Sequence, residues 1–188
     1  VRAGMIAGIE IKRFVETSLE PRRQLEMTPD PSLQLFLCEL IDGPDGEAKR
    51  PPNPDLARLE RGYAEWCRTK GGNVDEVLDL MADNIELRSV LSPDVPTGVA
   101  GQRDGKAQAR EYFRNVKDDW EVLDCEVERF IADGKDIVMV GYWKWRNLQT
   151  GRMVESPKVD IWHFEQGKAT SFLEMYDSLG VARAAGAA

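Results

Sequence analysis

The chain has almost no histidine, little cysteine and no long apolar segment. Its 188 residues include one histidine, His163, and three cysteines, Cys38, Cys67 and Cys125. A single histidine excludes a multi-histidine metal centre, although carboxylates alone can hold a hard cation. The cysteines are odd in number, far apart and without CxxC spacing, which argues against a disulfide framework or a zinc site. We therefore expect free thiols, no metal and a reducing, cytoplasmic compartment.

Positive charge is also scarce. The 25 Lys and Arg residues face 33 Asp and Glu residues, which gives a net charge of −8. Nucleic acid and anionic membranes repel such a chain, and no stretch has the apolar length of a membrane helix. A Gly-rich phosphate-binding loop is absent as well. These absences predict no nucleic-acid partner, no membrane partner and no cofactor.

The composition that remains is typical of one globular domain. Hydrophobic residues make up 42% of the chain and charged residues 31%, which is ordinary for a folded protein. A chain of this length buries one substantial core and is short for two. We predict an N-terminal extension and linker over residues 1–54, a single domain over residues 55–182 and a tail over residues 183–188.

The N-terminal extension leaves two interpretations open. Residues 33–41 (LQLFLCELI) form an apolar run that fits a strand or a helix equally well. Residues 42–55 are dense in Gly, Pro and charge, which is the composition of a linker. The extension is either poorly ordered sequence, with Met5 or Met27 as alternative starts, or an arm that packs on the domain or on a dimer partner.

After residue 55 the hydrophobic pattern predicts helices first. Apolar residues recur at helical spacing over residues 56–69, 74–81 and 106–117. Residues 85–90 alternate between apolar and polar, which is typical of a half-buried strand. Residues 92–105 are rich in Pro and Gly and are predicted to form a loop.

The remainder of the chain predicts an antiparallel meander. Runs rich in Val, Ile, Phe and Trp are separated by short turn sequences that contain Gly. Helices followed by a long meander are the order of an α+β fold, and long strands twist into a sheet with a concave face. The predicted strands are residues 120–132, 137–147, 153–164 and 168–177.

Three stretches of sequence carry a resemblance to a known family. They are RGYAEW at 61–66, DLMADNIELRS at 79–89 and VDIWHFEQGKATSFLEMYD at 159–177. The chain resembles the nuclear transport factor 2-like superfamily, which includes ketosteroid isomerases, scytalone dehydratases, limonene-epoxide hydrolases and SnoaL-like polyketide cyclases. The resemblance implies a cone-shaped, cystatin-like fold in which three N-terminal helices pack on a curved, mostly antiparallel sheet around a small-molecule pocket.

The same resemblance implies catalytic residues. Tyr63 matches the ketosteroid isomerase tyrosine that donates to the enolate oxygen, and Asp160 matches its partner aspartic acid. The isomerase base falls at Ser89, and a serine does not take a proton from a carbon acid at ordinary pH. Glu174 matches the acid/base aspartate of SnoaL-like cyclases, with Phe172 where their histidine is expected. Tyr63, Asp160 and Glu174 are therefore the predicted catalytic residues.

The predicted geometry brings the two acids together. Asp160 and Glu174 lie on neighbouring strands and face the same side only if their cross-strand register has the right parity. A two-residue turn gives the wrong parity, whereas a three-residue turn with a bulge at Gly167 gives the right one. The resemblance favours the second arrangement. The predicted substrate pocket on this face also contains Lys158, Trp162, Phe172 and Tyr176.

Two functional interpretations follow from this pocket. In the first, the chain is a cyclase, isomerase or dehydratase that acts on a carbonyl-bearing apolar molecule; Glu174 moves the proton while Tyr63 and Asp160 donate hydrogen bonds. In the second, the chain is a non-catalytic module that binds a small molecule or a partner. Separated, desolvated acids favour catalysis, whereas acids that Lys158 neutralises favour binding.

Large aromatic residues on both faces of strand 137–147 add one further prediction. They exceed what one monomer core can cover, so we expect a homodimer formed through exposed sheet faces.

Overall fold

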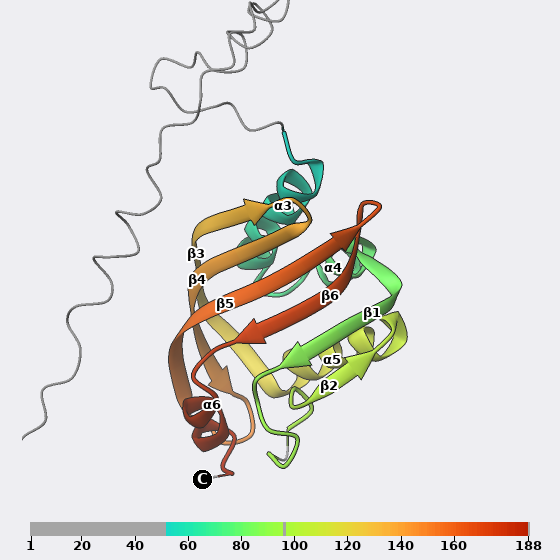
Figure 1. Cartoon of the computed structure of the whole chain (residues 1–188). Coiled ribbons are helices and arrows are strands. Elements are labelled where there is room, and N and C mark those ends of the chain that lie inside the picture. The colour runs from blue at the N-terminus through green and yellow to red at the C-terminus, as the bar shows by residue number, and fades with distance from the viewer. Residues whose placement is uncertain (1–51, 96, 188) are drawn as a thin grey trace, which may run out of the picture. The chain divides into compact units, whose positions relative to one another are not determined.

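The computed structural model describes residues 52–95 and 97–187. Residues 1–51, which contain most of the predicted extension, lie outside this part of the chain. In the described residues no helix is long and apolar enough to cross a membrane. The elements, drawn in Figure 1, are α3 (Pro54–Thr69), α4 (Val74–Leu80), β1 (Met81–Ser89), β2 (Gln102–Asp104), α5 (Lys106–Asp119), β3 (Trp120–Asp133), β4 (Asp136–Asn147), β5 (Met153–Glu165), β6 (Lys168–Met175) and α6 (Ser178–Ala184).

Helix α3 begins and ends where its sequence dictates. The Asn53 side chain accepts hydrogen bonds from the backbone N–H groups of Asp55 and Leu56, at 3.0 and 3.1 Å, and Pro54 occupies the first turn. At the other end Lys70 adopts a left-handed conformation with φ 51°, which closes the helix. Between these caps, Leu59 and Tyr63 lie buried one turn apart on the same face.

The strands form one curved sheet in the order β2-β1-β6-β5-β4-β3. Neighbours are antiparallel except β1 and β6, which are parallel. Helices α3, α4 and α5 lie behind the sheet in the view of Figure 1. The core fills the space between these two layers. Its most completely buried side chains include Leu59, Leu78, Ile85, Leu87, Ile137, Met139 and Trp143.

The predicted α+β class is confirmed, with local corrections. The described residues contain a fourth helix, α6, in place of the predicted three, and the predicted tail begins inside it. Seven residues are too few to show helical periodicity, but Asp177 caps α6 through the N–H of Gly180 and Val181 is buried. The predicted loop 92–105 contains the short strand β2, and Met81 begins β1 instead of ending a helix.

The turn between β5 and β6 differs from the prediction, although its consequence holds. Gln166 and Gly167, with φ 51° and 77°, form a two-residue turn between the paired Glu165 and Lys168. The predicted three-residue turn is therefore wrong. A register shift after His163 supplies the extra residue, and it restores the parity that the short turn removes.

Two of the cysteines form a disulfide, which corrects the expectation of free thiols. Cys67 in α3 and Cys125 in β3 are bonded, with their Cα atoms 5.2 Å apart and a sequence separation of 58. Sequence spacing gave no sign of this pair because only the packing of α3 on β3 brings the two residues together. Cys38 lies outside the described residues.

Candidate functional site

A cavity lies between the helices and the concave face of the sheet. Its volume is about 90 Å³, whereas a single water needs roughly 10–15 Å³, so the space suits a compact ligand. The walls are mainly aromatic and aliphatic. The seven site residues named from the sequence all line it: Tyr63, Lys158, Asp160, Trp162, Phe172, Glu174 and Tyr176.

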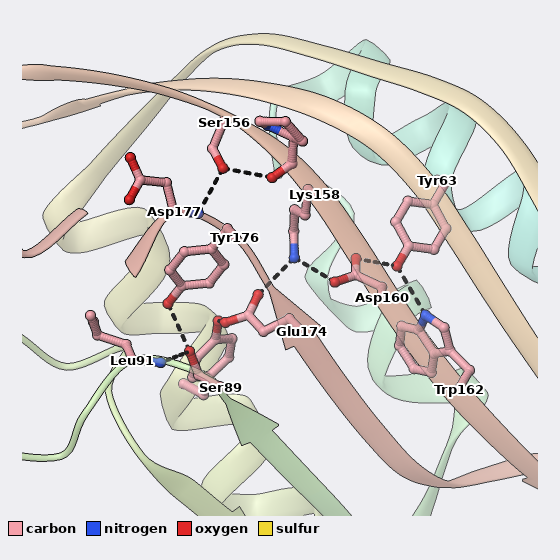
Figure 2. A network of polar contacts seen from close by, with 12 residues as sticks. Tyr63, Ser89, Leu91, Ser156, Lys158, Asp160, Trp162, Glu174, Tyr176 and Asp177 are labelled. Carbon is pink, nitrogen blue, oxygen red and sulfur yellow. Dashed lines mark hydrogen bonds and ion pairs between the residues drawn. The ribbon is translucent and has the colours of Figure 1, made fainter. Parts of the chain in front are cut away.

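The centre of the site is one lysine held by two acids (Figure 2). Lys158 Nζ lies 2.5 Å from Asp160 Oδ1 and 2.8 Å from Glu174 Oε2. Lys158 and Asp160 are two residues apart on β5 and therefore share a face, and Asp160 pairs directly with Glu174 on β6. The side chains of Lys158, Asp160 and Glu174 are only 8%, 2% and 7% exposed. We call these three residues the acid–lysine–acid triad.

Each acid also accepts a hydrogen bond from a tyrosine. The Tyr63 hydroxyl donates to Asp160 Oδ2 over 2.6 Å and itself accepts from Trp162 Nε1 over 2.9 Å. The Tyr112 hydroxyl, from α5, donates to Glu174 Oε1. Tyr112 is a site residue that sequence reasoning missed, because it reads as one more apolar position on an amphipathic helix. The available signal was its hydroxyl, since a buried tyrosine needs a polar partner.

Aromatic side chains enclose the lysine. Lys158 Nζ lies 5.8 Å from the ring centroids of Trp143 and Tyr176 and 5.9 Å from that of Phe172. Rings at this distance attract a cation through their negative faces and exclude water from it. Trp162 packs on Phe172 with ring centroids 4.3 Å apart, which extends the same apolar wall. The triad is therefore enclosed by aromatic rings as well as charged.

Burial and charge set the protonation of these groups. Burial raises the pKa of Asp160; Lys158 opposes this effect, and the neighbouring Glu174 reinforces it. Burial favours the neutral amine of Lys158, but the two carboxylates outweigh it and raise the pKa of that group. Burial, and next the adjacent carboxylate, raise the pKa of Tyr63 and of Tyr112. Both phenols are therefore neutral hydrogen-bond donors, and Lys158 is a cation.

Ser89 does not replace the missing base. Its hydroxyl lies 2.7 Å from the Tyr176 hydroxyl, at the end of β1 beside β6 (Figure 2). Burial raises the pKa of Tyr176, and Glu174 adds to the effect, so this pair is a neutral hydrogen bond. Its contribution to the cavity is to orient the Tyr176 ring beside Lys158.

Comparison with known proteins agrees with this architecture. Residues 59–172 match the SnoaL-like domain family. The chain belongs to this family. No curated protein matches it. The SnoaL-like domain is similar to a nuclear transport factor 2-like protein of Burkholderia pseudomallei K96243 at 23% identity and a TM-score of 0.61, over 71% of this chain and 98% of that one.

Two further solved structures contain small organic molecules. TerC, co-crystallised with polyporic acid, is similar at 19% identity and a TM-score of 0.59, over 71% of this chain and 99% of that one. A protein with a ketosteroid isomerase-like fold from Catenulispora acidiphila, in complex with trimethylamine, is similar at 12% identity and a TM-score of 0.56, over 72% and 95%. These likenesses establish the nuclear transport factor 2-like fold that the sequence predicted.

Proposed function

We propose that this SnoaL-like domain is a cofactor-independent enzyme of the isomerase, cyclase or dehydratase type. Its substrate is a largely apolar small molecule with a carbonyl group, bound in the cavity beside the triad. The observation that carries the proposal is the charge imbalance of the triad: two buried carboxyl groups contact one ammonium group. The imbalance makes one acid and one base available in the same buried site.

The charge count explains why. If both carboxyl groups are ionised, the triad carries one net negative charge, and an uncompensated charge in an apolar site is costly. The cost falls when a carboxyl group takes up a proton, and burial, which raises the pKa of Asp160, favours protonation of that group. We therefore assign the acid role to Asp160 and the base role to Glu174.

The hydrogen-bond inventory revises the predicted role of Tyr63. The Tyr63 hydroxyl already donates its proton to a hydrogen bond with Asp160, and its oxygen accepts a hydrogen bond from Trp162 Nε1. Lys158 has three N–H donors, of which the two carboxyl groups use two, and its third finds no acceptor within the described residues. We therefore assign the contact with the developing oxyanion to Lys158. Tyr63 instead holds Asp160 in place.

The nature of the ligand follows from the cavity walls. Aromatic rings surround the triad, so a flat, unsaturated molecule packs there with little strain. Polyporic acid, co-crystallised with TerC, supports the proposal that a protein of this fold binds such a ligand.

A second candidate function has its own supporting observation. Lys158 contacts both acids, and each acid also accepts from a tyrosine. Hydrogen bonds of this number make the two carboxyl groups rigid, and a rigid site can serve only to bind a ligand. In this alternative the domain is a binding module that performs no chemistry.

Proton exchange separates the two candidates. We would incubate the full chain in D₂O with 2-tetralone, a compact ketone with acidic α-protons, and follow exchange by ¹H NMR and binding by tryptophan fluorescence. The enzyme hypothesis predicts exchange faster than in buffer, lost in Glu174→Gln and retained in the control Glu165→Gln, which changes an exposed acid. Binding without exchange in any variant would support the binding module. No binding would contradict both.

A further inference from the structure

The Cys67–Cys125 disulfide joins the two layers of the domain at an edge of the sheet. Within the described residues β3 is the last strand in the sheet order and pairs only with β4. Cys125 lies in β3, and Cys67 lies in the last turn of α3. The bond therefore fixes the C-terminal end of α3 to a strand that has one neighbour. Lys70 Nζ, which follows the helix, also donates to Leu123 O of β3 over 2.9 Å, and this contact is exposed.

The opposite end of α3 is held separately. The Arg58 guanidinium donates to Gly167 O over 2.6 Å, which fixes the first half of the helix to the turn between β5 and β6. Tyr63 lies between this anchor and the disulfide. Because Cys67 follows Tyr63 by four residues, the two side chains share one helix face, one turn apart. The Tyr63 side chain itself packs on Phe130 of β3 and hydrogen-bonds Asp160 and Trp162, and the covalent anchor one turn away fixes the helix that carries it.

We propose that the Cys67–Cys125 disulfide is a redox switch. The intact bond keeps Tyr63 hydrogen-bonded to Asp160, and its reduction breaks that hydrogen bond and inactivates the site. The inference rests on the proposed function in one respect: it treats Asp160 as the acid of the site. Reduction by a dithiol transfers two electrons and two protons. The Sγ–Sγ bond breaks, Cys67 and Cys125 each become a thiol, and the dithiol becomes a disulfide. The last turn of α3 then moves away from β3, and Tyr63 moves with it.

The consequence is a change in the proton affinity of Asp160. The groups that face this carboxyl are Tyr63 from α3, Tyr112 from α5, Lys158 from its own strand, and Glu174 and Tyr176 from β6 and its end. Only Tyr63 lies beside the disulfide. Its hydrogen bond stabilises the carboxylate and so lowers the pKa of Asp160, against the larger effect of burial. Losing that hydrogen bond leaves the carboxyl group with a higher pKa and without its orientation.

The test compares oxidised and dithiol-reduced full-length protein. Cys38→Ser in all samples leaves one disulfide, whose state is read from the mass difference of two hydrogens. The Asp160 carboxyl is titrated by ¹³C NMR. We expect its midpoint to move upward on reduction. Oxidised Tyr63→Phe should already show the raised midpoint, and its reduction should add nothing. Cys67→Ser should show the same Asp160 midpoint as the reduced protein, and the dithiol should not change it.

Three results would overturn the inference. One is an Asp160 midpoint that is the same in oxidised and reduced protein. Another is an equal shift on reduction in Tyr63→Phe, because the effect would then bypass Tyr63. The third is loss of the cooperative fold on reduction, seen by circular dichroism, because the bond would then hold the fold together instead of controlling the site. The titration uses no ligand, so it remains informative if the proposed function fails.

Discussion

Replacing Lys158 by methionine should lower the free energy of unfolding by about 3–5 kcal/mol at pH 7, the range for breaking a buried ion pair. Methionine keeps the length and the apolar stem, so packing among the rings changes little. Both carboxyl groups lose a contact, at 2.5 and 2.8 Å. A charge-assisted hydrogen bond contributes about 1.5–3 kcal/mol, and two of them add to roughly the same range.

The loss of unfolding free energy should depend on pH, and the ionisation of the Asp160 carboxyl sets the direction of that dependence. Burial already raises the pKa of this group in the folded protein, and Lys158 opposes the rise. Without the lysine the folded-state pKa rises further above the unfolded value. A group of this kind contributes stability below its unfolded pKa and loses it as the pH rises through its folded pKa. The variant should therefore recover part of its stability between pH 7 and pH 5.

Urea denaturation followed by tryptophan fluorescence at both pH values measures the effect. Lys144→Met is the matched control: Lys144 Nζ lies 2.5 Å from Glu155 Oε1, but these side chains are 35% and 47% exposed. An exposed pair contributes about 0–1 kcal/mol, so the control should change little. A Lys158→Met loss no larger than that of the control, or equal at both pH values, would refute the claim that this lysine compensates two buried acids.

Three other predictions concern the rest of the chain. Cys125→Ser should lower the unfolding free energy by about 4 kcal/mol, the chain-entropy value for closing a long loop, here between residues 58 apart; unchanged urea denaturation would disprove it. Deleting residues 1–49 should leave cooperative thermal unfolding intact, and a broad, non-cooperative transition would show that this segment is structural. Light scattering should detect a homodimer, and Ile161→Glu should yield a monomer because its cross-strand neighbours on the outer sheet face are apolar; a monomeric parent protein would exclude the dimer.

The sequence predicted most of the fold because long elements carry strong patterns. Helix α3, expected over residues 56–69, differs at one end by the cap at Asn53, and the four long strands agree to within a few residues. The exceptions are short. Strand β2 has three residues and α6 has seven, and neither length allows periodicity to appear above the composition of a loop.

The sequence predicted which residues form the site but not which of them contact one another. Strand alternation and the family resemblance brought Lys158, Asp160 and Glu174 to one face. Whether the lysine binds one acid, both or neither depends on side-chain reach, which no pattern contains. Tyr112 and the Cys67–Cys125 bond were missed for a related reason, since each depends on a helix packed against a strand distant in sequence.

The most direct test of the site is whether Glu174 influences the pKa of Asp160. It is made by titrating the Asp160 carboxyl by ¹³C NMR in the wild-type chain and in Glu174→Gln. An unperturbed aspartate has a pKa of about 3.9. The account predicts a wild-type midpoint above this value, because burial and the Glu174 carboxylate raise the pKa of Asp160. It predicts a fall in Glu174→Gln, where Lys158 pairs with Asp160 alone. An ordinary midpoint in the wild type, or the same midpoint in both proteins, would contradict it.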